Sequence, residues 1–203
     1  MSVADTARDR LSEYARRGRR LIVLSGPSGV GKSSIGERLE KEYRCARAIT
    51  ATTRAARGGE RNGVHYHFCS REQFVADVAA GQFLEHADVY GNLYGTPVHS
   101  VVAVLERGDD ALLIIDVQGA RQLMDRAIEA AYVFVEPPNF SELERRLRGR
   151  ASEDPAALAR RLETAHAELA QKSRYQHCVV NENLAEAVAL LARMLPLSKR
   201  EQQ

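Results

Sequence analysis

Residues 25–34 read SGPSGVGKSS, and they directly follow the apolar run LIVL at 21–24. The glycines of this stretch bring no side chain to a core, and glycine is used where a backbone takes unusual φ/ψ angles or approaches another group closely. The stretch fits G-x-x-x-x-G-K-[ST], in which backbone amides surround phosphates and the lysine reaches the terminal ones. The loop therefore predicts a nucleoside triphosphate site. Its expected phosphate-binding residues are Gly26, Pro27, Ser28, Gly29, Val30, Gly31, Lys32, Ser33 and Ser34.

The residues on either side of the loop agree with this interpretation. LIVL is typical of a short buried strand, and Ile35 and Leu39 are spaced four apart, as on one face of a helix. The positive end of that helix adds to the attraction for phosphate. In this motif the Ser33 hydroxyl coordinates Mg²⁺, and we expect Lys32 to point into solvent-filled space. The alternative is a glycine-rich turn without a ligand, and the agreement of strand, loop and helix disfavours it.

The length and composition of the chain limit its domain count, its partners and its cellular compartment. With 203 residues and a net charge of +2, the chain suits one domain with inserted segments, and its nearly balanced charge predicts no nucleic-acid or membrane partner. Cys45, Cys69 and Cys178 lack metal-ligand spacing and suit a reducing compartment. No run is long and apolar enough for a membrane span, and the N-terminus lacks a signal-peptide core. We expect a cytoplasmic enzyme that is a monomer or a small homo-oligomer.

Apolar runs alternate with helical patterns along the chain. Continuous apolar strands between helices favour a parallel sheet covered on both faces, here an α/β fold of the three-layer P-loop NTPase type. The runs lie at 21–24, 111–116, 131–136 and 178–180, and the helical patterns at 32–42, 98–107, 118–129, 140–149, 155–172 and 183–194. Residues 50–97 break the pattern, being rich in Arg, Tyr, Thr, Gly and His. We interpret them as an inserted mixed α/β segment with a working surface.

An acid at the end of a neighbouring strand usually organises Mg²⁺ beside such a loop. Asp116 closes the run ALLIID and is the candidate, acting with Ser33 and through a bound water. An alternative role for Asp116 is the N-cap of the next helix, and the two roles are compatible.

Arginines cluster after Pro137-Pro138. Arg146 and Arg150 are four apart and share one face of an expected helix, and Arg161 follows on the next helix. Guanidinium groups placed there would stabilise the charge that develops on a transferred phosphoryl group. The alternative is a solvated charged helix face.

From about residue 20 to 195 the chain resembles the guanylate kinases. The phosphate loop alone is shared by many NTP-binding proteins, but the middle segments are specific to this family. The segments that carry the resemblance are SGPSGVGKSS, TATTRAARGGERNGVHYHF at 50–68, GQFLEHADVYGNLYGTP at 81–97, IIDVQGA at 114–120, PPNFSELERRLRGR at 137–150 and RRLETAHAEL at 160–169.

The resemblance implies an ATP:GMP phosphotransferase of purine nucleotide metabolism, with Mg²⁺ as cofactor and dGMP as a further acceptor. It implies an extension at 1–19, a kinase domain at 20–195 and a tail at 196–203. Within the kinase domain we expect a core of 20–49, 98–138 and 173–195, a GMP-binding insertion at 50–97 and a helical lid at 139–172.

The resemblance also assigns roles to single residues. It implies a catalytic set of Lys32, Arg54, Arg146, Arg150 and Arg161, and it places Asn181 near the adenine. It implies a GMP site of Thr50, Arg54, Arg57, Tyr66, Glu85, Tyr94, Thr96 and Asp116. The chemistry is consistent, since arginine forks suit a phosphate dianion and one carboxylate accepts the two adjacent N–H donors of guanine.

Some residues depart from the family pattern or have other interpretations. Ile114 stands where many members carry a second acid, and Thr50 and Thr96 stand where serine is common. His65 and His67 are expected on one side of a strand, where a metal pair can be imagined, but without a third ligand solvent-facing histidines are favoured. The basic N-terminal stretch is expected to dock weakly or to fray. Alternative functions are a kinase for a ribose bisphosphate, which has no base for Glu85 to bind, and a phosphopeptide-binding module, which typically loses the phosphate loop.

Overall fold

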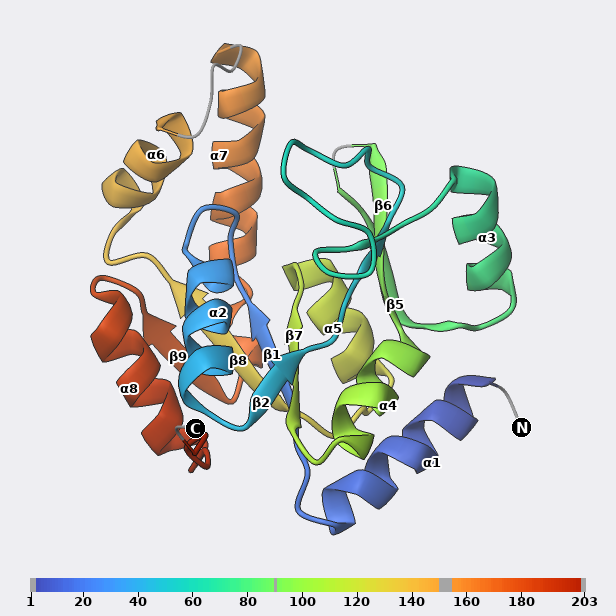
Figure 1. The fold of residues 1–203 in the computed structure, drawn as a ribbon. Helices are drawn as coiled ribbons and strands as arrows, with labels where there is room; N and C mark the ends of the chain where they lie inside the picture. The colour runs from blue at the N-terminus through green and yellow to red at the C-terminus, as the bar shows by residue number, and fades with distance from the viewer. Residues whose placement is uncertain (1–2, 90, 150–154, 202–203) are drawn as a thin grey trace. The chain divides into compact units, whose positions relative to one another are not determined.

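The computed structural model describes residues 3–89, 91–149 and 155–201. The fold is mixed α/β with a parallel central sheet (Figure 1). The chain forms two compact units. Unit 1 comprises Met1–Leu21, Cys45–Leu113 and Gln118–Ala130, and unit 2 comprises Ile22–Arg44, Ile114–Val117 and Ala131–Gln203. Each unit is described separately below.

Unit 2 is built on three parallel strands. They are β1 (Leu21–Ser25), β8 (Ala131–Glu136) and β9 (His177–Val180), with Leu24 opposite Val133 and Phe134 opposite Cys178. Every residue of β1 is buried, as its unbroken apolar sequence requires of a strand covered on both faces. The helices of this unit are α2 (Lys32–Glu42), α6 (Phe140–Arg148), α7 (Pro155–Leu169) and α8 (Leu184–Met194), with a short 3₁₀ helix at Lys172–Arg174.

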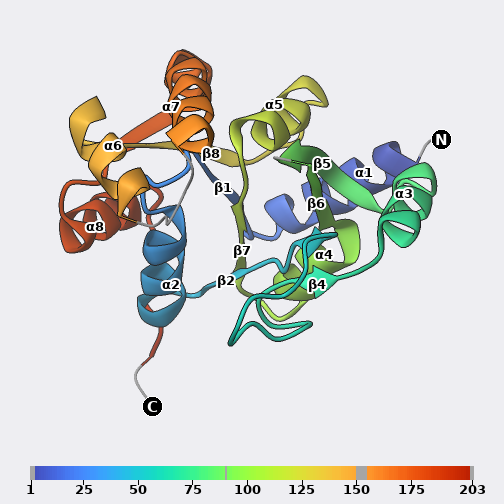
Figure 2. The same ribbon diagram turned by 90° about the horizontal axis from the view of Figure 1, so that it is seen from above.

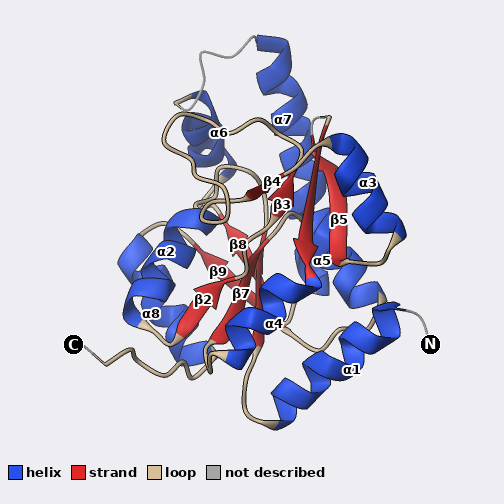
Figure 3. Ribbon diagram, turned by 45° about the vertical axis from the view of Figure 1, so that its right-hand side comes forward, coloured by secondary structure: helices blue, strands red, loops and turns tan. Residues whose placement is uncertain are grey.

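Unit 1 contains a second, four-stranded sheet in the order β4-β3-β6-β5 (Figure 3). Phe74 and Phe83 stack at 4.5 Å and form its small core with Ala51. The strands are β3 (Ala51–Thr52), β4 (His67–Phe68), β5 (Phe83–Val89) and β6 (Asn92–Pro97). The unit also holds β2 (Cys45–Arg47), which pairs in parallel with β7 (Asp110–Ile114), and the helices α1 (Val3–Arg16), α3 (Arg71–Ala79), α4 (Val98–Glu106) and α5 (Val117–Asp125).

The hydrogen-bonded order of the parallel sheet is β2-β7-β1-β8-β9. Several element ends differ from the sequence-based expectation. β7 ends at Ile114, so Asp116 lies beyond the strand. α5 ends at Asp125 because Ala127 adopts a positive φ of 51°. Within the residues the structure describes, no helix has the length and apolar character to cross a membrane.

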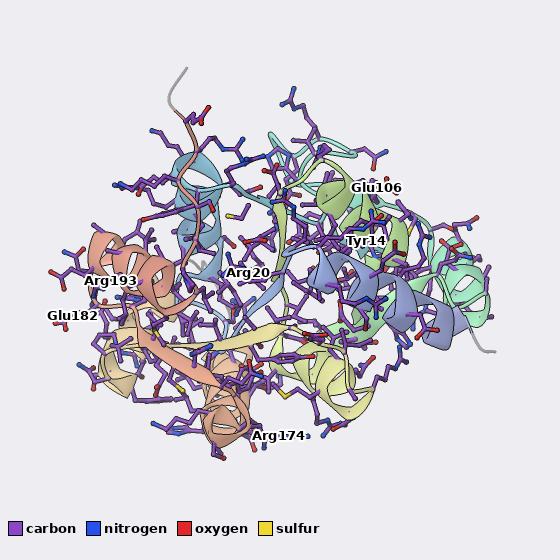
Figure 4. All side chains as sticks on the ribbon, turned by 90° about the horizontal axis from the view of Figure 1, so that it is seen from below. Tyr14, Arg20, Glu106, Arg174, Glu182 and Arg193 are labelled. Atoms are coloured by element: carbon purple, nitrogen blue, oxygen red, sulfur yellow. The ribbon has the colours of Figure 1, made fainter. Side chains whose placement is uncertain are left out.

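The N-terminal stretch forms helix α1, which packs against α4. Leu11 is only 5% exposed, so the helix contributes to the core of unit 1. The Tyr14 hydroxyl donates to Glu106 at 3.2 Å, as the view in Figure 4 shows. After the helix, Arg20 forms a 3.0 Å ion pair with the buried Asp110. The stretch that was expected to dock weakly or fray is therefore fastened at several points.

Candidate active site

The phosphate loop, residues 26–33, connects β1 to α2 in unit 2. Gly26 and Gly31 have φ angles of 135° and 94°, a region that residues with a Cβ rarely adopt. A Cβ at Gly26 would lie 2.3 Å from the Val135 carbonyl oxygen, and one at Gly31 would lie 2.3 Å from Asn181 Nδ2. Both glycines are therefore required by backbone angle and by space.

Asn181, which follows β9, braces this loop. Its buried side chain donates from Nδ2 to the Val30 carbonyl at 2.7 Å, and its backbone N–H donates to the Glu136 carbonyl at 2.8 Å. Its backbone carbonyl accepts from Arg146 Nη2 at 3.1 Å. The residue expected near the adenine thus joins the loop, strand β8 and helix α6.

Lys32 folds back onto its own loop. Its Nζ donates to the carbonyls of Gly26 at 2.5 Å and Pro27 at 3.0 Å. The expectation that Lys32 points into solvent-filled space was wrong. An ammonium group needs acceptors, and the loop carbonyls at the start of the motif lie within its reach.

Glu168 is a member of this site that sequence reasoning missed. Burial raises the pKa of its carboxyl to about 7; the charge of Lys32 opposes that rise and the charge of Asp116 adds to it. The backbone N–H of Ser28 donates a hydrogen bond to the same carboxyl. Glu168 lies in the last turn of α7, where the helix dipole disfavours an acid, and that position is the signal that could have identified it.

The arginines after Pro138 lie on α6 and α7, which pack against each other (Figure 2). Arg146 Nε donates to Glu142 at 2.8 Å, and the guanidinium groups of Arg145 and Arg146 lower the pKa of Glu142 to about 2. Phe140 and His166 stack at 3.8 Å between the two helices. Arg161 lies half-buried on α7. Arg150 lies outside the described residues.

In unit 1, Arg54 is held by a fork of hydrogen bonds. Its Nη1 and Nη2 donate to the two oxygens of Glu60 at 3.0 and 2.9 Å, and its Nε donates to the Tyr94 hydroxyl at 3.2 Å. Tyr66 adds a cation–π contact, with the guanidinium carbon 5.4 Å from the ring centre. These contacts fix the plane of the guanidinium, and the hydrogen bond to Glu60 raises the pKa of Arg54.

Glu60 joins the two arginines expected at the acceptor phosphate. Its Oε2 also accepts from the backbone N–H of Arg57 at 2.7 Å, and these hydrogen bonds lower the pKa of Glu60 to about 2. A carboxylate held by an arginine fork marks a place where an oxyanion is stabilised. Sequence reasoning missed Glu60, because nothing in its spacing separates it from any other loop acid.

Glu85 and Thr96 form a buried polar pair in unit 1. Glu85 is 3% exposed, Thr96 is fully buried, and Thr96 Oγ1 donates to Glu85 Oε1 at 2.5 Å. The two residues face each other across β5 and β6. Glu85 lies within β5 and not at its end. Thr50 lies half-buried just before β3, and its carbonyl accepts from the His67 N–H at 2.9 Å.

His65 and His67 are not paired on one side of a strand, because β4 begins only at His67. His65 Nδ1 accepts from the backbone N–H of Arg61 at 3.0 Å, whereas His67 Nε2 lies 3.4 Å from Ser100 Oγ. Among the described residues, no cluster of three His, Cys, Asp or Glu side chains is placed to hold a metal ion.

Comparison with known proteins identifies a family that this chain resembles. A family model described as guanylate kinase matches residues 18–197. The guanylate kinase of Clostridium perfringens (strain 13 / Type A) is 43% identical over 180 residues, which are 88% of this chain and 83% of that protein. That of Streptomyces coelicolor is 46% identical over 168 residues, 82% of this chain and 85% of that protein. A crystal structure of guanylate kinase from Anaplasma phagocytophilum has a TM-score of 0.72 and 32% identity, covering 88% of this chain and 85% of that one.

Proposed function

The chain belongs to the guanylate kinase family and is a nucleoside monophosphate kinase, and from this premise we propose that it transfers the γ-phosphoryl group of ATP to GMP, giving GDP and ADP. The observation that carries the choice of GMP is the buried Glu85–Thr96 pair. We further propose a place in cytoplasmic purine nucleotide metabolism, which suits its nucleotide substrates and its free cysteines.

The donor nucleotide binds at the phosphate loop of unit 2. Amides freed of side chains by Gly26, Gly29 and Gly31 take the phosphates, and Lys32 exchanges its loop carbonyls for phosphate oxygens. Phosphoryl transfer demands little covalent chemistry of the protein, so positioning and fixed positive charge supply most of the catalysis. Arg146 of α6 and Arg161 of α7, together with Arg150, provide that charge in this proposal.

Mg²⁺ suits the oxygen donors beside the loop. Ser33 is the second residue of α2, and the Asp116 carboxylate lies close enough to Glu168 to influence its pKa. Hydroxyl, carboxylate and phosphate oxygens are the ligands that Mg²⁺ prefers. When bound, the ion neutralises charge on the phosphate oxygens. Because Ile114 brings no second acid, Asp116 fills the metal-side role through a bound water.

The acceptor phosphate binds at Arg54 and Arg57. Two guanidinium groups supply several donors to a phosphate dianion, and the hydroxyls of Tyr66 and Tyr94 complete the set. Glu60 holds Arg54 in one plane before the nucleotide arrives, which reduces the entropy lost on binding. The same fork limits how the guanidinium of Arg54 presents its N–H groups to the phosphate.

The guanine base of GMP is recognised by the Glu85 carboxylate. A buried carboxylate is costly without partners, and guanine supplies two adjacent donors, N1–H and N2–H₂. The hydroxyls of Thr96 and Thr50 complete the polar surroundings of the base. Adenine would place an unprotonated N1 against the carboxylate, and such mispairing can discriminate by about 10⁴-fold or more.

The test is ADP release with a panel of acceptors at saturating ATP and Mg²⁺. The proposal predicts the highest kcat/KM for GMP, appreciable transfer to dGMP, and little to AMP, CMP, UMP or a ribose bisphosphate. Equal or faster transfer to AMP or to the base-free acceptor would overturn the assignment of the base site. Absence of transfer to every acceptor would overturn the proposed reaction.

A further inference from the structure

Strand β5 carries a bulge immediately before the base-reading residue. Phe83 pairs with Pro97, yet Glu85 pairs with Thr96, so Leu84 is an extra residue in the ladder. Phe83, Leu84 and Glu85 are consecutive and all buried, at 7%, 3% and 3% exposure. A bulge re-aims the side chains that follow it and often lies beside a functional site. Here it aims Glu85 at Thr96.

In the part of the chain that the structure describes, β5 is the edge strand of its sheet, and its outer backbone groups have no strand partner there. A side chain of α5 and one from the turn after it bond these groups, and Figure 2 shows α5 beside β5. Gln122 Oε1 accepts from the His86 N–H at 3.2 Å, and its Nε2 donates to the His86 carbonyl at 2.5 Å. Arg126 Nη1 donates to the carbonyl of the bulge residue, Leu84, at 2.8 Å. The two residues that flank Glu85 are therefore both held, one by α5 and the other by the turn that follows it.

We propose that Gln122 and Arg126 are positioning residues for base recognition. Their hydrogen bonds to the backbone of β5 hold the bulge that orients Glu85, and so set the preference for guanine. The inference rests on the proposed function, because it names what fixes the specificity of the same site. Neither residue contacts the nucleotide in this scheme. Both act through the backbone of β5.

The physical reason is the register of β5. A slip of one residue would turn the side chain of Glu85 to the other face of the sheet, and a relaxed bulge would misalign it. One carboxylate must meet two adjacent donors at once, so small errors of aim weaken guanine binding. They leave the acceptor phosphate on Arg54 and the donor site untouched. A merely structural role for Gln122 would instead change every substrate and the stability together.

The experiment compares Gln122→Ala, Gln122→Glu and Arg126→Ala with the matched control Arg121→Ala, an exposed arginine on the same helix. Calorimetry gives Kd for GMP and AMP, and steady-state kinetics give kcat and the KM for GMP and for ATP. We expect Gln122→Ala to raise the Kd and KM for GMP about tenfold, the effect of roughly one lost hydrogen bond, with AMP binding, kcat and the KM for ATP unchanged. Arg126→Ala should act in the same direction, and Arg121→Ala should match wild type.

Gln122→Glu keeps the size of the side chain and the acceptor for the His86 N–H, but it loses the donor to the His86 carbonyl. An intermediate loss of GMP preference is expected, and this variant tests the proposal even where Gln122→Ala fails to fold. The amide hydrogen exchange of residues 83–89 should be faster in Gln122→Glu than in wild type, and fastest in Gln122→Ala.

The outcomes separate the two claims. Wild type without a preference for GMP over AMP would contradict the proposed function. Wild type with that preference, together with folded Gln122 and Arg126 variants that keep the same GMP-to-AMP ratio, would overturn the positioning role alone. A loss that is equal for GMP, AMP and ATP would also overturn it.

Discussion

Glu85 is an acid inside a strand, with 3% of its surface exposed and a buried threonine hydroxyl at 2.5 Å. Burial of such a group is costly unless its oxygens accept hydrogen bonds, and in the proposed complex guanine adds two donors. Glu85→Gln keeps the size but places an amide donor against a guanine N–H. We predict that kcat/KM for GMP falls about 100-fold while that for AMP changes little. Glu129→Gln, on an exposed acid, is the control, and an unchanged GMP-to-AMP ratio would show that Glu85 does not read the base.

Lys32 is the residue of the phosphate loop whose charge matters most. Its ammonium group donates hydrogen bonds to the Gly26 and Pro27 carbonyls. Lys32→Ala should lower GMP-dependent ADP production by about 100-fold or more, because one preorganised charge at the transferred group is lost. Lys41→Ala, on the exposed last turn of the same helix, should retain wild-type turnover. Near-normal production by Lys32→Ala would contradict the assignment.

Glu168 links stability to pH. Its pKa is raised from 4.5 to about 7 by burial, so between these values the folded protein keeps a proton that the unfolded chain has released. Stability therefore falls as the pH rises through this range. Glu168→Gln removes that fall, and its advantage over wild type should grow between pH 5 and 8 by up to about 3 kcal/mol. Urea unfolding at several pH values measures it, and parallel pH profiles for the two proteins would contradict the raised pKa.

Residues differ in how far their roles can be predicted from sequence. The loop glycines and Lys32 have fixed spacing, so their pattern alone predicts phosphate binding. Glu60, Gln122 and Glu168 act through partners that are distant in sequence or depend on side-chain rotamers, and no spacing encodes such contacts. They become evident only from the folded geometry.

Secondary-structure elements also differ in how far a sequence pattern predicts them. The apolar patterns of β1, α2 and β8 predicted nearly their observed ends. The strands β2, β3 and β4 are two or three residues long, too short for any periodicity to mark them. β7 was expected to reach residue 116 but ends at Ile114, because strand pairing, and not the apolar run, decides where a ladder stops.

Helix α1 is fastened to unit 1 mainly by its apolar side. Leu11 is 5% exposed, whereas the Tyr14–Glu106 hydrogen bond lies at the surface. We predict that Leu11→Ala lowers the free energy of unfolding by about 2 kcal/mol or more, the usual cost of a truncated core leucine. Tyr14→Phe should cost less than about 1 kcal/mol. Chemical denaturation measures both, and equal small effects would mean that α1 docks only loosely.

At the scale of the whole molecule, the residues for the two substrates belong to different compact units. The phosphate loop, Lys32 and the lid arginines lie in unit 2, and Arg54, Arg57, Glu85 and Thr96 lie in unit 1. In the proposed reaction, unit 2 holds the triphosphate, and unit 1 holds the phosphomonoester and the base. Phosphoryl transfer from ATP to GMP requires the groups of both units, and loss of either set should abolish GDP formation without abolishing binding of the other nucleotide.

The most direct measurement follows the transferred group itself. ATP carrying ¹⁸O in its γ-phosphoryl group is incubated with GMP, Mg²⁺ and the protein, and the products are analysed by mass spectrometry. We predict that the label appears in the β-phosphoryl group of GDP, in amounts equal to the ADP formed, and that Lys32→Ala abolishes it. Label found in inorganic phosphate while GMP stays unchanged would contradict the account.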